Sequence, residues 1–376
     1  MRRMTRRLRR STTIAVLLAA LLAGCATREP APEQPVRPAD ARALIARVLP
    51  AQVGDRAGWA TDIYAALASL RLEPSASNVC AVIGVTEQES GFQADPSVPG
   101  LPKIAWQQIE QRAQRAGVPM LLVRGALNLS SSDGKTYAER IDAVKTEREL
   151  SEIFEDFIGM APMGRRLFAG WNPVRTGGPM QVSIDFAQRH ADEKPYPYPV
   201  DDSVRHEVFT RRGGMYFGIA HLLDYPARYD RLLYRFADFN AGHYASRNAA
   251  LQNAISVASG IPLVLDGDLV RHGADADAPP GNTETAARVL AERLRMSENA
   301  IRRDLEQGDG EALERTTLYE RVFALADKLE GQPVPRAVVP TIELRSPKIT
   351  RKLTTAWFAN RVDERYRRCL ARAGSS

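Results

Sequence analysis

Amphipathic helical segments dominate this sequence and restrict the chain to mostly α folds. Apolar residues recur with the spacing of about 3.6 residues that is typical of a helix with one buried face. Alternation typical of strands is confined to two short pieces, 262–270 and 338–344. The predicted helices are 56–70, 77–90, 103–116, 147–158, 214–223, 228–239, 248–259, 283–294, 297–305, 311–329 and 350–370.

The net charge of +6 comes from the first 24 residues, which hold six arginines and no acidic residue. Without them, the remaining 45 Lys and Arg equal the 45 Asp and Glu. A neutral body with interspersed signs offers no surface for tracking phosphates, so we expect no nucleic-acid partner. With 44% hydrophobic and 26% charged residues, the chain has the composition of an ordinary globular protein.

The first 24 residues are predicted to be a signal peptide, because an arginine-rich start precedes an apolar stretch, 14–22, that is too short to span a bilayer. The sequence LAGC at 22–25 resembles the bacterial lipobox. That resemblance implies that Cys25 is acylated, with palmitate or a similar chain, and becomes the new N-terminus. Ala26 after the cysteine implies an outer-membrane lipoprotein of a Gram-negative bacterium that faces the periplasm. The alternative is an ordinary secretory signal in which Cys25 has no role.

Domain boundaries follow from composition. Residues 25–39 are predicted to form the acylated cysteine and a tether with four prolines, so the folded body begins near Asp40. A stretch rich in Gly, Asp and Pro at 272–282 predicts a boundary between a functional unit, 40–271, and a smaller C-terminal helical unit, 283–376.

Several familiar chemistries are absent from the sequence. The five histidines never occur with a glutamate at the spacing of a zinc-protease helix, and no two cysteines lie close enough for a structural zinc. Gly134-Lys135-Thr136 lacks the first glycine of a phosphate loop, and no nucleophile elbow is present. We therefore expect no metal and no cofactor.

The segment 78–92 predicts an amphipathic helix that is stopped by Gly91. In helical projection Glu89 falls between Val82 and Val85 on the apolar face, and Glu87 lies further round. Partial burial and the negative end of the helix dipole would both raise the pKa of Glu89, as a glycosidic general acid requires. The alternative is that Glu89 is a solvated residue of the last turn.

Two further segments carry amides at special backbone positions. GGPMQVS at 177–183 is predicted to open a helix with glycines that let backbone approach a ligand, and it contains Gln181. FNAG at 239–242 lies between two amphipathic helices and contains Asn240.

ESGF, GGPMQVS and FNAG, in this order, resemble the three signature segments of the lysozyme-like lytic transglycosylases. The stretch 212–225 is similar to the helix before the third segment, and the whole chain resembles uncharacterised proteobacterial outer-membrane lipoproteins with such a domain. The resemblance implies a lysozyme-like helical domain with an insertion at about 95–171, because 92 positions separate Glu89 from Gln181. It implies Glu89 as the catalytic acid and base, and as substrate-binding residues Ser90, Met180, Gln181, Phe239 and Asn240.

The implied reaction is cleavage of the β-1,4 bond between N-acetylmuramic acid and N-acetylglucosamine in peptidoglycan glycan strands, with a 1,6-anhydromuramyl product. One carboxylate suffices, so Asp185 and Asp238 are interpreted as residues of helix surfaces. Phe239 replaces the family's tyrosine, which leaves a hydroxyl missing unless Tyr216 or Tyr244 supplies it. That departure favours the alternative, a non-catalytic binding or structural lipoprotein with a lysozyme-like cleft.

Cys80 and Cys369 are the thiols left when Cys25 is acylated. An oxidising periplasm permits them to pair, which would join the C-terminal helix to the helix that carries Glu89. Alternatively, Cys80 is a small buried residue without a partner. The sequence leaves both possibilities open.

Overall fold

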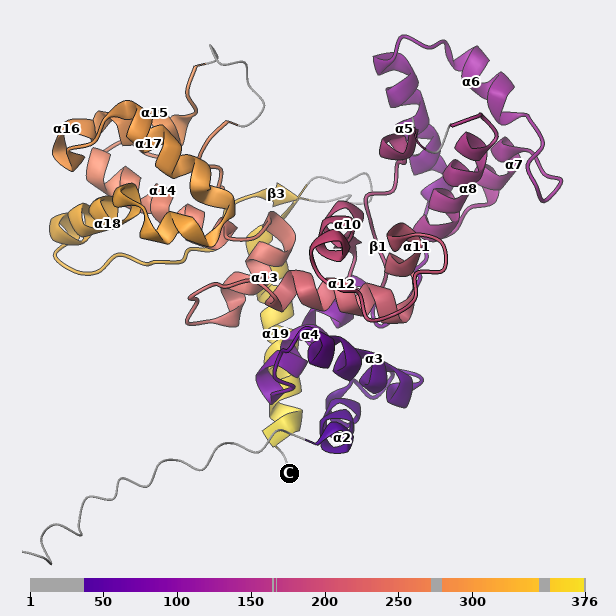
Figure 1. Cartoon of the computed structure of the whole chain (residues 1–376), viewed down its shortest axis with the longest axis horizontal. Helices are drawn as coiled ribbons and strands as arrows, with labels where there is room; N and C mark the ends of the chain where they lie inside the picture. The colour runs from indigo at the N-terminus through magenta and orange to yellow at the C-terminus, as the bar shows by residue number, and fades with distance from the viewer. Residues whose placement is uncertain (1–36, 164–165, 167, 272–278, 345–351, 375–376) are drawn as a thin grey trace, which may run out of the picture. The chain divides into compact units, whose positions relative to one another are not determined.

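The protein is mostly α-helical, as predicted (Figure 1). The computed structural model describes residues 37–163, 166, 168–271, 279–344 and 352–374, so the signal peptide, Cys25 and most of the tether lie outside the described residues. So does most of the expected boundary at 272–282. No helix of the described ranges combines the length and the apolar character needed to cross a bilayer.

The helices that precede the first strand are α2 (Pro38–Val48), α3 (Arg56–Ser69), α4 (Ala76–Glu89), α5 (Leu101–Arg115), α6 (Met120–Leu127), α7 (Tyr137–Ala143), α8 (Glu147–Gly159) and the 3-10 turn η1 (Ala169–Trp171). A hairpin of β1 (Thr176–Gly177) and β2 (Val182–Ser183) follows. The next helices are α10 (Ile184–Glu193), α11 (Val204–Val208), α12 (Arg211–Leu223), α13 (Leu232–Ala241) and α14 (Ala245–Ser259).

The remaining elements are α15 (Asn282–Val289), α16 (Ala291–Leu294), α17 (Glu298–Leu305), the 3-10 turns η2 (Glu306–Asp309) and η3 (Glu311–Arg315), α18 (Thr317–Glu330), β3 (Glu343–Leu344), β4 (Leu353–Thr354) and α19 (Thr355–Gly374). Nine of the eleven predicted helices each overlap one helix of the structure. The predicted helix 283–294 is divided into α15 and α16, and 311–329 into η3 and α18. Helices α2, α6, α7, α10 and α11 add to the predicted set.

The predicted strand at 262–270 is wrong, because this segment has no strand partner. The side chain of Gln252 holds it as a loop instead. Its amide nitrogen donates to Asp266 Oδ1 (2.7 Å) and to the carbonyl of Asp268 (3.0 Å), and its oxygen accepts from Gly267 N (2.8 Å). Alternation of apolar residues in this segment therefore reflects loop packing.

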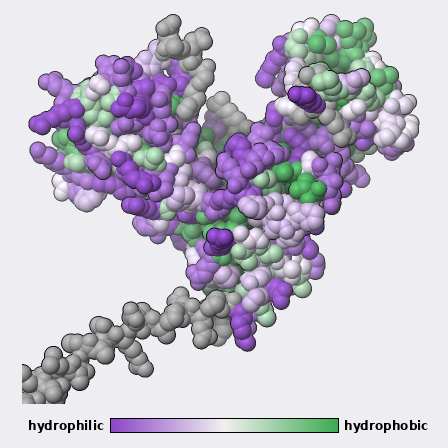
Figure 2. Space-filling view, viewed as in Figure 1, coloured by the Kyte–Doolittle hydropathy of each residue, from purple (hydrophilic) through white to green (hydrophobic). Residues whose placement is uncertain are grey.

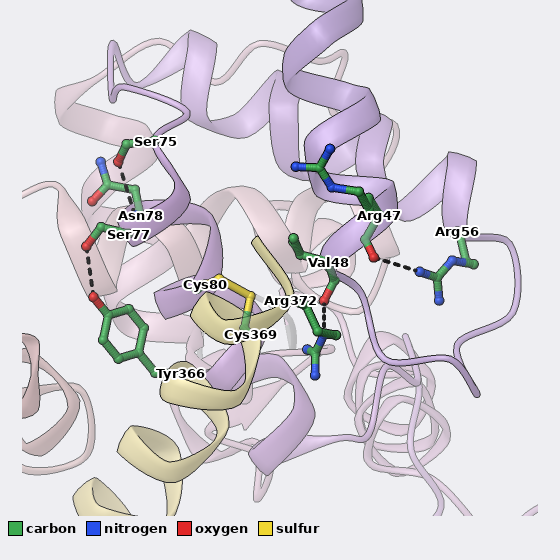
Figure 3. Close-up of a disulfide and its surroundings, with 10 residues drawn as sticks. All are labelled: Arg47, Val48, Arg56, Ser75, Ser77, Asn78, Cys80, Tyr366, Cys369 and Arg372. Carbon is green, nitrogen blue, oxygen red and sulfur yellow. Dashed lines mark hydrogen bonds between the residues drawn. A yellow bond between two sulfur atoms is a disulfide. The ribbon is translucent and has the colours of Figure 1, made fainter. Parts of the chain in front are cut away.

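The pairing of α4 with α19 is the central helix contact of the fold (Figure 1). Cys80 and Cys369, both fully buried, are joined by a disulfide, which is one of the two possibilities that the sequence leaves open. Figure 3 shows the hydrogen bond between Ser77 Oγ and the hydroxyl of Tyr366 (3.1 Å) beside this bond. Gly84 lets the helices approach, because a Cβ there would lie 3.2 Å from the carbonyl oxygen of Val362.

Buried apolar residues group the helices differently from the predicted division at 272–282. Phe358 and Val362 of α19 belong to the hydrophobic cluster that contains α4, α12 and α13. Leu251 and Ile255 of α14 instead pack with the C-terminal helices, including Phe323 of α18. An amphipathic pattern shows which face of a helix is buried, but it does not show which other helix covers that face. The sequence therefore could not indicate that α19 packs with α4 and that α14 packs with the C-terminal helices.

Helices α5 to α8 occupy most of the expected insertion at about 95–171. They contact one another, and α7 and α8 each begin with a capping box that satisfies backbone donors at both helix starts. This group of helices separates the end of α4 from the β1–β2 hairpin along the chain.

Replacing both Cys80 and Cys369 by Ser is expected to lower the free energy of unfolding by about 2–5 kcal/mol, the usual effect of losing a native disulfide. Denaturant unfolding of oxidised protein measures the change. The double variant should no longer respond to reductant, whereas wild-type protein should. Mass spectrometry that finds two free thiols in non-reduced protein would contradict the bond.

Candidate functional site

The end of α4 holds Glu89 and Ser90. Glu89 is the last residue of the helix and is half-buried, and Gly91, at φ 59°, reverses the chain as predicted. The hydroxyl of Ser90 donates to the carbonyl of Thr86 (3.2 Å) and accepts from Gln93 N (3.3 Å). Ser90 therefore acts as a cap that fixes the last turn, and Glu89 is held at a defined position at its end.

Glu87 faces a different helix from the candidate site. Its Oε1 lies 3.7 Å from Arg365 Nε and 3.5 Å from Arg368 Nη2, both on α19. Burial, partly offset by the charge of Glu87, lowers the pKa of the Arg365 guanidinium. The two glutamates at the end of α4 thus have separate environments, and Glu87 belongs to the α4–α19 contact.

The GGPMQVS segment forms a β-hairpin instead of opening a helix. Thr176 pairs with Ser183 and Gly177 with Val182, and α10 begins only after Ser183, which caps it. The turn closes with Gln181 N donating to the carbonyl of Gly178 (3.1 Å). Gly178 and Gln181 have φ of 72° and 50°, and such left-handed positions cannot continue a helix.

The side chain of Gln181 is half-buried at this turn. Its amide nitrogen donates to the carbonyl of Gly178 (3.2 Å), and its oxygen accepts from the Thr176 hydroxyl at 3.5 Å, the outer limit of a hydrogen bond. The side chain of Met180 is fully buried, so it packs beneath the turn in the protein interior and does not line an open cleft.

Glycines of α12 let the hairpin approach this helix closely. A Cβ on Gly218 would lie 2.6 Å from the Cβ of Met180, and one on Gly214 would lie 2.4 Å from Cδ of Pro179. A Cβ on Gly178 would lie 2.1 Å from the carbonyl oxygen of Val208. These distances are far below van der Waals contact, so the hairpin keeps its place only while these positions remain glycine.

The FNAG segment ends α13. Asn240 is exposed, and its Oδ1 accepts from the hydroxyl of Thr355 at the start of α19 (3.4 Å). Phe239 is buried, and its carbonyl accepts a hydrogen bond from Nε2 of His221 on α12 (3.1 Å). The backbone just before Asn240 is therefore tied to the same helix that carries the hairpin.

Asp238 is fully buried, and its interpretation as a residue of a helix surface is wrong. Its carboxylate accepts from the hydroxyls of Tyr225 (3.1 Å) and Tyr229 (2.6 Å) and from the backbone nitrogens of Tyr244 (3.0 Å) and Ser246 (2.7 Å). Burial raises the pKa of Asp238, although these donors act in the opposite direction. Asp238 thus shapes the loop from α13 to α14. Asp185 is exposed, as predicted.

Three histidines gather around Phe186, which the sequence did not indicate. The rings of His190, His221 and His243 lie 5.6, 4.7 and 5.7 Å from that of Phe186. Burial, reinforced by the charge of His243, lowers the pKa of His221 to about 3. His221 is therefore neutral, and its proton sits on Nε2, because the Phe239 carbonyl can only accept. In the described part of the chain, His221 Nδ1 is buried without a hydrogen bond.

Neither candidate tyrosine replaces the hydroxyl that Phe239 lacks. The hydroxyl of Tyr216 contacts His190 Nε2 (3.3 Å) and donates to the carbonyl of Pro195 (3.2 Å). The ring of Tyr244 lies 4.3 Å from the guanidinium carbon of Arg247. Within the described ranges, no hydrogen bond joins either hydroxyl to Glu89.

One helix brings the three segments to the same part of the fold. Met215 Sδ of α12 lies 3.9 Å from Oγ1 of Thr86, whose hydroxyl donates to the carbonyl of Val82 (2.8 Å). The carbonyl of Thr86 in turn accepts from the hydroxyl of Ser90, next to Glu89. Three residues further along α12, Gly218 packs on Met180, and one turn later His221 binds Phe239. Positions three apart on a helix are neighbours, so a single strip of α12 supports all three segments.

Among the described residues, no group of three or more His, Cys, Asp or Glu has the arrangement of a metal site. The functional groups that these three segments offer are the carboxyl group of Glu89, which can act as an acid or a base, and the amide side chains of Gln181 and Asn240.

Gly218→Ala is expected to lower the free energy of unfolding by about 1–3 kcal/mol, because the added methyl group overlaps Met180. Denaturant unfolding measures the change. Gly125→Ala in α6 is the matched control, because a Cβ there meets nothing within 4 Å and alanine favours a helix. Equal unfolding midpoints for the two variants would contradict the close packing on α12.

Comparison with known proteins identifies the family. The family described as "Protein of unknown function (DUF1615)" matches residues 52–372. The "Uncharacterized protein YaiW" of Escherichia coli (strain K12) is 53% identical over 360 residues, which cover 96% of this chain and 98% of the relative. No solved structure matches the chain. By both the family match and the relative, the chain belongs to the DUF1615 family.

Proposed function

We propose that this protein is a lytic transglycosylase with a lysozyme-like fold that cleaves the β-1,4 bond between N-acetylmuramic acid and N-acetylglucosamine in peptidoglycan. The observation that carries the proposal is the strip of α12, whose Met215, Gly218 and His221 support the segments of ESGF, GGPMQVS and FNAG. The order of these segments in the chain is that of the transglycosylase signatures, and their common support gives the resemblance a structural basis.

In the proposed reaction Glu89 first protonates the glycosidic oxygen, and the bond from that oxygen to C1 of the muramyl sugar breaks. The resulting carboxylate then removes the proton from the 6-hydroxyl of the same sugar, whose oxygen bonds to C1. Glu89 regains its proton, and the product carries a 1,6-anhydro ring. Gln181 and Asn240, whose side chains reach solvent, would hold the sugars on either side of the cleaved bond.

A single carboxylate carries this scheme, whereas most glycosidases use two. Asp238 cannot serve as a second one, because its oxygens already accept four hydrogen bonds in a buried site. The environment of Asp238 therefore removes one candidate base for the activation of water, in keeping with attack by the substrate's own hydroxyl.

A cavity of about 420 Å³ beside the hairpin supports a substrate rich in hydroxyl and amide groups. Arg175 and Ile184, which flank the two strands, are among its lining residues, and Gln188, Asp202 and Arg205 add polar groups. Glu89, Gln181 and Asn240 do not line this cavity, so its polar side chains would suit a part of the glycan or its attached peptides away from the cleaved bond.

A second candidate function is binding of glycan strands without cleavage. Phe239 and the engagement of the Tyr216 hydroxyl with His190 and Pro195 favour it, because the family's tyrosine hydroxyl is missing at position 239 and Tyr216 does not replace it. The two candidates share the site and differ in turnover.

Glu89→Gln is expected to lower turnover by at least about two orders of magnitude, the usual scale of general acid catalysis, because the amide keeps the shape of the side chain and cannot supply the proton. The assay is release of 1,6-anhydromuropeptides from purified sacculi, identified by mass spectrometry. Binding of sacculi should remain.

Glu87→Gln is the matched control on the same helix. It removes a charge that contacts Arg365 and Arg368, so it should lower stability slightly and leave turnover per folded molecule unchanged. Wild-type protein that binds sacculi and releases no product would establish the binding function instead. Reducing ends in place of the anhydro product would indicate a hydrolase.

We further propose that the protein is anchored through acylated Cys25 to the outer membrane, facing the periplasm, where peptidoglycan is its partner. Cys25→Ala is expected to abolish acyl labelling and to shift the protein out of the membrane fraction, because acyl chains provide the anchor. Fractionation and metabolic labelling with a palmitate analogue measure this. Unchanged labelling in the variant would refute the assignment of the anchor to Cys25.

A further inference from the structure

Helices α5 to α8 line most of an open cavity of about 380 Å³ that the proposed cleavage does not use. Every residue that lines it is apolar or aromatic except Arg112. Ile109 of α5, Leu127 of α6, and Ile153 and Phe157 of α8 are among them. Its volume lies within the range of about 300–1,000 Å³ that is usual for ligand pockets, so it can admit a chain of hydrocarbon.

Large apolar side chains near this cavity remain exposed to solvent. Leu122 and Trp171, which line the cavity, are 64% and 54% exposed, and Leu121 on the same helix as Leu122 is 82% exposed. Figure 2 shows hydrophobic residues gathered over α6. Exposed apolar groups in a cluster are typical of surfaces that meet a partner or a membrane.

Arg112 lines the apolar cavity, and Arg115 and Arg175 lie close enough for their charges to act on it. Burial, followed by the charges of Arg175 and Arg115, lowers the pKa of Arg112. Arg112 donates to the carbonyl of Trp171, and Arg175 donates to that of Gly170 (2.7 Å). None of the three arginines forms an ion pair with another residue of the described ranges. Their positive charges therefore remain available to an anion.

We propose that the α5–α8 cavity holds an acyl chain of an anionic membrane phospholipid, whose phosphate binds Arg112, Arg115 and Arg175. Leu121 and Leu122 of α6 would then contact the hydrocarbon of neighbouring lipids. These leucines favour a lipid in a membrane over a free fatty acid, because a fatty acid inside the cavity would leave them in water. The arrangement is that of a helix lying in the membrane interface, with apolar residues inserted and arginines at the head groups.

The test uses the full chain on vesicles of phosphatidylcholine that contain phosphatidylglycerol with a photoreactive acyl chain. Because the proposed anchor on Cys25 would keep the protein on every vesicle, the readout is the position of crosslinks, mapped by mass spectrometry. Crosslinks are expected in peptides from 101–127 and 147–173. Photoreactive phosphatidylcholine in the same vesicles should give fewer crosslinks there, because it lacks a net negative charge.

Two variants should each reduce crosslinks by at least about tenfold, equivalent to 1.4 kcal/mol of binding free energy. The first is Ala126→Trp, whose larger side chain fills the cavity. The second combines Leu121→Ser and Leu122→Ser and leaves the cavity open. The paired leucine change affects only exposed side chains, so it keeps the test valid if Ala126→Trp fails to fold. Val264→Ser with Val289→Ser, also at exposed positions, is the matched control and should have no effect.

Arg112→Gln with Arg175→Gln should reduce crosslinks from phosphatidylglycerol to the level of phosphatidylcholine, whereas Arg303→Gln, at an exposed position, should not. Crosslinks spread evenly over the exposed helices would overturn the proposal. So would crosslinks in 101–127 and 147–173 that all variants retain. Labelling of these peptides by a photoreactive fatty acid and not by phosphatidylglycerol would also overturn it, in favour of a site for free fatty acids.

Discussion

Close packing of backbone against the glycines of α12 is the constraint on which the candidate site depends. The GGPMQVS hairpin rests on Gly214 and Gly218 at distances that leave no room for a Cβ. Because Met180 fills the space above Gly218, the turn that presents Gln181 has one position relative to the helix. The same helix holds the ends of α4 and α13 through Met215 and His221, so displacement of α12 would move all three segments together.

Local features of the site could be predicted from the sequence where a single residue type determines the backbone conformation. Gly91 predicted the end of α4, and its φ of 59° agrees. The hairpin at 177–183 could not be predicted in this way, because Gln181 adopts φ 50°, which the residue type does not favour and which the surrounding contacts impose. Its conformation depends on Val208 and α12, which lie further along the chain.

Features that depend on several segments at once escaped prediction for a related reason. The position of Asp238 in the helical pattern is that of a surface residue, yet its carboxylate is buried. Hydrogen bonds from two tyrosine hydroxyls and two backbone nitrogens offset the free-energy cost of removing this carboxylate from water. The histidines around Phe186 are scattered in the sequence and meet because α10, α12 and the loop after α13 converge. The helical class was predictable from periodicity alone, whereas the partners of α14 and α19 were set by packing.

The pairing of α4 with α19 imposes an order on the maturation of the chain. The apolar face that α4 presents to Val362 and Phe358 has no cover until the last described helix has been synthesised. A nascent chain therefore cannot complete this core from its N-terminus onward. Formation of the bond from Cys80 to Cys369 would mark the moment at which the body becomes resistant to unfolding, well after α4 itself is made.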